Sequence, residues 1–72
     1  MKVKIVEVEE KGWDTISKDI LYEDTIPVPM KGEIIYINNV AYKVIHISRY
    51  FYTDKLIENY VKVEVLKTTL YP

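Results

Sequence analysis

One residue in three of this chain carries a β-branched side chain. Its 72 residues include ten Ile, nine Val and five Thr, together with seven Tyr and a single Ala. β-branched and aromatic side chains fit the pleated surface of a sheet, whereas Ala and Leu favour helices. The composition therefore predicts an all-β fold. A chain of this length allows one domain, which we expect to span residues 1–72.

A domain of this size is marginal in stability, because it buries only about 60% of its unfolded surface. Small domains usually gain stability from disulfides, a metal or a partner chain. This chain has no Cys and a single His, His46, so it cannot form a disulfide or a zinc site of the Cys/His type. The remaining routes are a well-packed core or an oligomer.

Alternating apolar residues predict a three-strand antiparallel meander in the C-terminal half. A strand over 34–37 is followed by Asn38-Asn39, which suits a two-residue hairpin turn because Asn tolerates positive φ. The return strand covers about 40–50. A third strand begins at 57 or 60 and ends at 67.

The N-terminal half is less regular. Residues 2–9 read as a strand whose apolar face switches between Ile5 and Val6, as a β-bulge would cause. This strand can close or extend the meander. Residues 13–24 are compatible with a short amphipathic helix, with an irregular loop or with a strand. Two prolines then predict an extended linker over 25–32.

The middle of the chain resembles small SH3-like or partly open β-barrel proteins of bacteria and phages. The pattern is Pro-x-x-Gly-acid, a short strand, a tight turn and then Tyr-x-Val-x-x-Ile. It is formed by Pro29, Gly32, Glu33, Ile35, Ile37, Tyr42, Val44 and Ile47. The resemblance covers residues 27–67 and implies a small barrel, but it implies no shared active site because a fold does not determine function. Many such proteins are phage accessory proteins.

The chain lacks the residue combinations that most catalytic sites need. His46 lies between Ile45 and Ile47, and Ser48 is two residues away, about 7 Å along a strand and beyond a hydrogen bond. Two glycines are too few for a phosphate-binding loop, and the acidic residues do not have the spacing of a calcium loop. We therefore expect a non-enzymatic protein that needs no cofactor or metal.

A run of aromatic residues indicates binding instead. Tyr50, Phe51 and Tyr52 are consecutive, so in a strand they cannot all enter one core. Together with Arg49 they are of the residue types enriched at protein interfaces. We predict that this segment is a contact surface.

The predicted strands over 34–37 and 40–47 are also apolar on both faces. Either a bulge turns Ile47 inward or a second chain covers the remaining apolar side chains. Our leading hypothesis is a phage-type accessory protein that binds a host protein in the host cytoplasm, as a homo-oligomer. Neither a leader segment nor a membrane-spanning segment is apparent in the sequence.

Two alternative functions remain open at this point. A small nucleotide-like ligand would bind at a subunit interface, with tyrosines stacking on the base and Lys43, Arg49 or Lys62 meeting the phosphate. A single-stranded nucleic acid would use the same residue types, since small barrels bind bases on aromatic side chains in a basic groove. The pI near 5.7 and the single arginine argue against nucleic acid.

Overall fold

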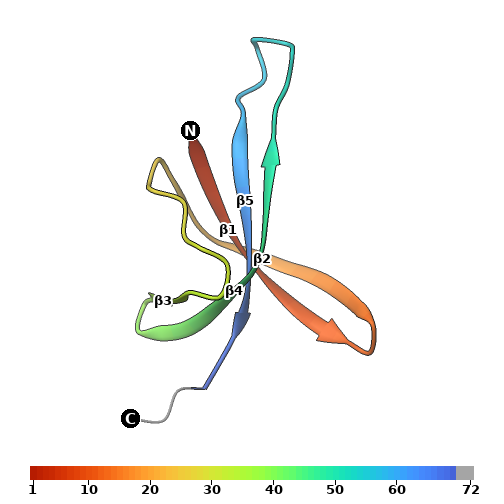
Figure 1. Ribbon diagram of the computed structural model, residues 1–72, viewed down its shortest axis with the longest axis vertical. Coiled ribbons are helices and arrows are strands. Elements are labelled where there is room, and N and C mark those ends of the chain that lie inside the picture. Colours follow the sequence, from red (N-terminus) through yellow and green to blue (C-terminus); the bar gives the residue numbers. More distant parts are fainter. Residues whose placement is uncertain (70–72) are drawn as a thin grey trace.

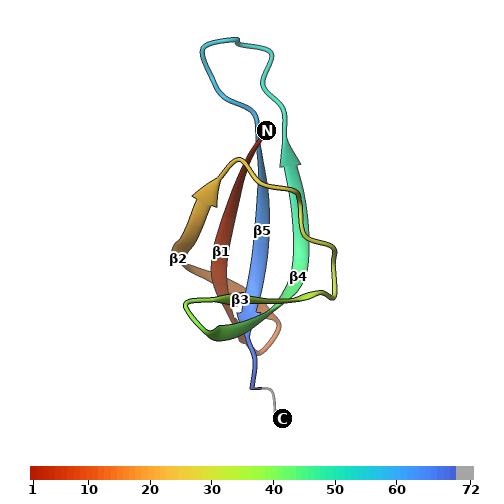
Figure 2. The same cartoon turned by 90° about the vertical axis from the view of Figure 1, so that its left-hand side faces the viewer.

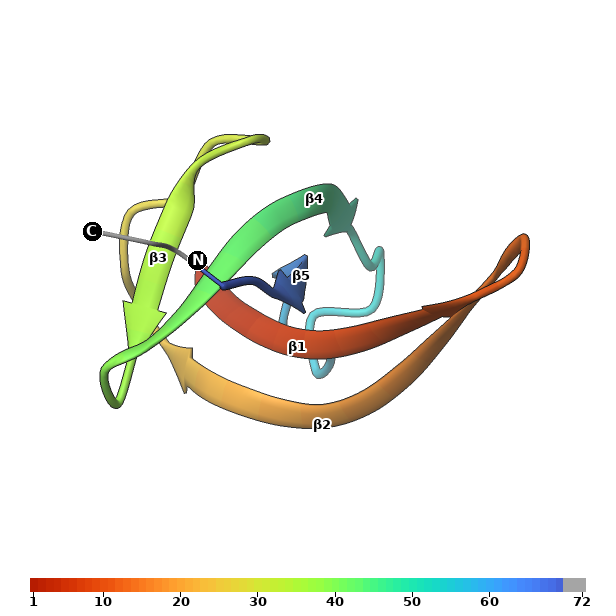
Figure 3. The same ribbon diagram turned by 90° about the horizontal axis from the view of Figure 1, so that it is seen from below.

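The computed structural model describes residues 1–69 and shows one five-stranded sheet with the strand order β2-β1-β5-β4-β3 (Figure 1). The strands are β1 (Lys2–Lys11), β2 (Asp14–Asp24), β3 (Ile34–Ile37), β4 (Val40–Tyr50) and β5 (Tyr60–Lys67). The sheet curls into a small, partly open barrel (Figure 3), which confirms the all-β prediction. Since the described residues form no helix, they offer no helical membrane span.

The predicted meander is confirmed. β3, β4 and β5 form two consecutive antiparallel pairs, and β1 forms a separate antiparallel hairpin with β2. The two halves are joined where β1 pairs in parallel with β5, with Val3 opposite Val61 and Ile5 opposite Val63. The barrel is therefore antiparallel apart from this one pair, which the local sequence pattern does not predict.

Residues 14–24 form the long edge strand β2, so the short helix that the sequence allowed is not formed. The spacing of Trp13, Ile16 and Ile20 suggested the buried face of a helix. These three side chains do not form a buried face, because all three are largely exposed. The register of β2 against β1 is interrupted twice, which breaks the simple alternation of a strand.

The core lies on one face of the curled sheet. Its centre is formed by five fully buried valines from the three neighbouring strands β1, β5 and β4: Val3, Val44, Val61, Val63 and Val65. Ile26 and Val28, from the linker that follows β2, pack against this cluster. Figure 2 shows the linker crossing in front of the sheet on its way to β3. The linker thus covers part of the side on which the barrel is open.

Two bulges decide which apolar residues reach the core. The register of β1 shifts between Ile5 and Val6, which confirms the predicted switch of faces. The register of β4 shifts between Val44 and His46, and Ile47 consequently packs against the core. A bulge therefore accounts for Ile47 without a second chain.

The hairpin between β3 and β4 has the predicted turn. Asn38 and Asn39 have φ values of 50° and 66°, as a type I′ turn requires. Before β3, Gly32 has a φ of 89°, and its N–H donates to the carbonyl of Val44 at 2.8 Å. The Val44 N–H in turn donates to the carbonyl of Glu33 at 2.9 Å, and these two bonds hold the end of the linker against β4.

Candidate functional site

Three tyrosines stack on the face of the sheet opposite the core. Tyr50, at the end of β4, lies directly across from Tyr60, at the start of β5. Their ring centroids are 4.7 Å apart and their planes differ by 15°. The ring of Tyr52 follows at 6.4 Å from that of Tyr60, at 25°. We call these three residues the tyrosine stack.

Two lysines lie over these rings. The Nζ atom of Lys4 is 4.2 Å from the ring centroid of Tyr60, and the Nζ atom of Lys62 is 5.8 Å from that of Tyr50. Both distances allow an attraction between the cation and the ring. The register explains the arrangement, because Lys4 and Lys62 are direct neighbours across β1 and β5 on this same face.

Lysines on this face also have carboxylate partners. The ion pairs are Lys2–Glu58 at 3.3 Å, Lys4–Glu23 at 3.6 Å and Lys62–Glu64 at 3.8 Å. Such exposed pairs contribute little to stability. They do neutralise the positive charge around the tyrosine stack, so this face does not form a strongly basic groove.

The loop between β4 and β5, residues 51–59, extends the tyrosine stack with apolar side chains. Phe51, Leu56 and Ile57 are 68%, 95% and 47% exposed. Figure 1 shows this loop projecting beyond the end of the sheet, away from the other elements. The core therefore cannot shield these three side chains from water.

Hydrogen bonds hold this loop in a defined conformation. The Asp54 carboxylate accepts a bond from the Leu56 N–H at 2.9 Å, and the Asp54 carbonyl accepts one from the Ile57 N–H at 3.1 Å. The side-chain oxygen of Asn59 accepts a bond from the Tyr52 N–H at 2.7 Å. Asp and Asn are residues that typically build such turns. The loop is therefore an ordered turn that presents apolar groups to solvent.

The structure brings four of the six residues that the sequence singled out for binding to one end of the molecule. Tyr50 and Tyr52 belong to the tyrosine stack, and Lys62 lies over it. Phe51 lies in the adjoining loop, next in the chain to both tyrosines. The end of β4 and the start of β5 lie at the same end of the sheet, so these four residues belong to one end of the molecule.

The other two residues are elsewhere. Arg49 is paired with Val61, a core residue, so the register places Arg49 on the opposite face from Tyr50. Lys43 lies seven residues before Tyr50 on β4, which separates the two by roughly 20 Å along the strand. Neither residue is placed to act with the tyrosine stack.

Sequence reasoning missed Tyr60 and Lys4. Tyr60 begins a strand in which Val61, Val63 and Val65 alternate with polar residues, so its position on the polar face was predictable. Its contact with Tyr50 also required the register between β4 and β5. The contact with Lys4 required the parallel pairing of β1 with β5, for which the sequence contains no local signal.

Burial raises the pKa of the Tyr60 hydroxyl above its ordinary value of 10.0, and the neighbouring Tyr52 raises that pKa further. The cause is that an ionised phenolate is poorly solvated beside another phenol. Tyr60 therefore stays neutral over the physiological pH range.

Among residues 1–69, no three His, Asp or Glu side chains are grouped so that they could hold a metal ion. His46 is exposed and lies opposite Glu64 on β5. Together with Glu10, Thr15 and Ile45, these two residues line a shallow hollow.

Comparisons of this chain with protein-family models, with curated proteins and with solved structures find no match. Its function is therefore inferred from the residues and geometry described above.

Proposed function

We propose that this chain is a non-enzymatic binding protein that recognises another protein through the loop 51–59 and the tyrosine stack. The observation that carries the proposal is the ordered loop that exposes Phe51, Leu56 and Ile57 beside three stacked rings. Exposed apolar side chains gathered at one place on a surface are typical of interaction sites, and Ile57 lines one hollow together with Tyr52 and Tyr60. Aromatic side chains are also over-represented among the residues that contribute most to interface affinity.

The proposed setting is that of a phage accessory protein that modulates a host protein in the host cytoplasm. Its support is the resemblance of residues 27–67 to small barrel proteins of bacteria and phages. A homo-oligomer belongs to the same proposal, because the loop 51–59 is a surface that a second copy would also cover. The bulge that turns Ile47 inward removes one reason for an oligomer but leaves the exposed loop unexplained.

The geometry favours a protein partner over a nucleotide or a single-stranded nucleic acid. A base needs a free ring face on which to stack. Here the rings of Tyr50 and Tyr60 face one another, and Lys4 lies over Tyr60. Lys4 and Lys62, the two lysines that lie over the rings, are already paired with carboxylates. A ligand that binds the folded state raises the midpoint of thermal unfolding, so nucleotides should cause no thermal shift. Filter binding at low salt should likewise detect no affinity for a single-stranded nucleic acid.

The test compares two triple variants. Phe51→Ser, Leu56→Ser and Ile57→Ser change the loop, whereas Trp13→Ser, Ile16→Ser and Ile20→Ser remove an equal number of exposed apolar side chains from the β1–β2 hairpin. Both sets are exposed, so both variants should fold, which circular dichroism checks. Quantitative affinity capture from host lysate and light scattering then follow.

A partner, or a second copy, that is retained by the wild type and by the hairpin variant but lost by the loop variant supports the proposal. A partner retained equally by the loop variant would overturn it. If the loop variant does lose the partner, alanine substitutions at Tyr50, Phe51 and Tyr52 would show whether the tyrosine stack contributes to the same surface.

A further inference from the structure

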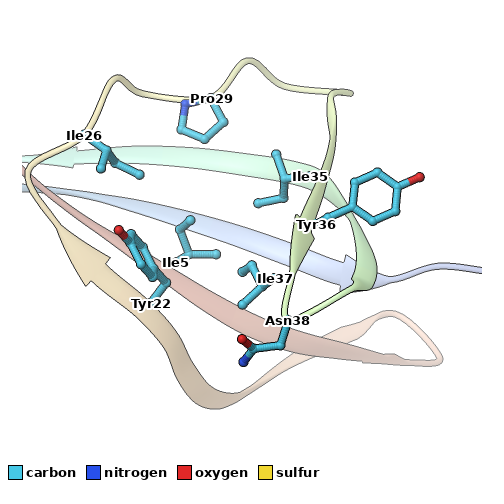
Figure 4. Close-up of a pocket in the computed structure, with 8 residues that line it drawn as sticks. All are labelled: Ile5, Tyr22, Ile26, Pro29, Ile35, Tyr36, Ile37 and Asn38. Carbon is cyan, nitrogen blue, oxygen red and sulfur yellow. The ribbon is translucent and has the colours of Figure 1, made fainter.

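A hollow opens where the barrel is not closed, between the edge strands β2 and β3 (Figure 4). Its volume is about 410 Å³, and pockets that take small molecules typically measure roughly 300–1,000 Å³. Its walls are mostly aliphatic. They include Ile5 of β1, Ile26 and Pro29 of the linker, and Ile35 and Ile37 of β3.

The polar groups at this hollow are few and uncharged. None of the residues that line it is Lys, Arg, Asp, Glu or His. The Asn38 amide lies at one end, in the turn in which Asn38 has a φ of 50°. The Tyr22 ring lies on the side of β2, and its hydroxyl donates to Asp24 at 3.4 Å. Figure 4 shows the Tyr36 ring pointing away from the hollow.

We propose that this hollow binds an uncharged, largely apolar small molecule with one hydrogen-bonding group, which the Asn38 side chain meets. An ionised ligand would lose its hydration there without gaining an opposite charge, which is unfavourable. A flat apolar ring would instead displace water from the walls formed by Ile5, Ile35 and Ile37. The site shares no residue with the loop 51–59 or the tyrosine stack, so it is independent of the proposed function.

The test uses 2-naphthol, which combines an apolar double ring with one hydroxyl. In a titration followed by ¹H–¹⁵N NMR, we expect saturable shifts at the amides of Ile5, Ile26, Ile35, Ile37 and Asn38. The dissociation constant should be about 1 mM or lower, as suits a ligand of this size. 2-Naphthalenesulfonate has the same rings and a permanent negative charge, and should bind at least about tenfold more weakly.

Two variants test the role of Asn38. Asn38→Gly removes the amide from the hollow, and Asn39→Gly removes an amide from the same turn outside it. Gly adopts positive φ readily, so both variants should fold. We expect Asn38→Gly to weaken 2-naphthol binding about fivefold, as the loss of one hydrogen bond would, and Asn39→Gly to leave it unchanged.

Four results would each overturn the proposal. They are shifts that do not saturate, shifts centred on the tyrosine stack instead of the hollow, equal affinity for the sulfonate, and equal affinities of the two Asn variants for 2-naphthol.

Discussion

Tyr50 and Tyr60 stack across β4 and β5 with ring centroids 4.7 Å apart and planes 15° from parallel. The pair lies at the end of the sheet, where the backbone ladder gives way to the loop 51–59. Because Tyr60 also contacts Lys4 of β1, the ring contacts connect three strands at the point where the loop begins. The stack therefore supports both the sheet and the surface proposed to bind.

We expect the two rings to be energetically coupled. A double-mutant cycle with Tyr50→Leu, Tyr60→Leu and the double variant should give a coupling free energy of about 1 kcal/mol, the usual contribution of a stacked aromatic pair. Urea unfolding measures it. A coupling indistinguishable from zero would mean that the two rings pack independently.

Alkaline pH should destabilise the fold through Tyr60. Its pKa in the folded chain lies above 10.0, because of burial and then the neighbouring Tyr52. The folded state therefore holds this proton more tightly than the unfolded state, and the free energy of unfolding falls as the pH rises above about 10. Urea unfolding at pH 9 and pH 11 should show a larger drop for the wild type than for Tyr60→Phe. Absorbance of the phenolate should show one tyrosine that ionises late in the wild type and is missing from that variant.

The bulge in β4 makes Ile47 a core residue, so its truncation should be costly. Ile47→Ala should lower the free energy of unfolding by about 2 kcal/mol, at the low end for a buried aliphatic side chain because Ile47 is only partly buried. Ile20→Ala removes the same atoms from the exposed edge strand and should change stability by less than about 0.5 kcal/mol. Similar losses in both variants would contradict the register observed between β4 and β5.

Charged side chains should keep the free edge of β2 from pairing with another chain. β2 is long and carries exposed Ile16 and Ile20, a combination that invites pairing with another chain. Lys18 and Asp19 lie where the register against β1 is irregular, and both charge and irregularity discourage such pairing. The double variant Lys18→Thr, Asp19→Thr should therefore self-associate more than the wild type. Light scattering should show its average mass rising with protein concentration.

The control for that prediction is Lys31→Thr with Glu33→Gln, which removes one charge of each sign from the end of the linker beside β4, away from this edge. An equal gain in mass for the control pair would attribute the effect to lower charge in general and would contradict a role for β2.

Features with a local cause were predictable from the sequence. The hairpin over 34–50 follows from the conformational freedom of Asn38 and Asn39, and from alternation that is visible within a few residues. The bulge after Ile5 was likewise visible as a switch in the apolar face. The exposure of Phe51 followed from the fact that three consecutive aromatic side chains cannot share one side of a strand.

Features that join distant segments were not predictable in this way. The parallel pairing of β1 with β5 brings Lys4 beside Tyr60, residues far apart in the chain. The helix-like spacing in β2 was ambiguous because an irregular, exposed edge strand leaves no clear burial pattern. The position of Arg49 depended on the bulge at Ile45, which reverses the face of every later residue in β4.

The central place of β5 has a consequence for how this protein is made. The hairpin β1–β2 and the hairpin β3–β4 touch β5 from opposite sides, and the sheet order gives them no direct pairing with one another. During synthesis both hairpins leave the ribosome before the strand that unites them. Neither half can complete the valine core until residues 60–67 insert between them, so the order of synthesis delays cooperative folding to the final step.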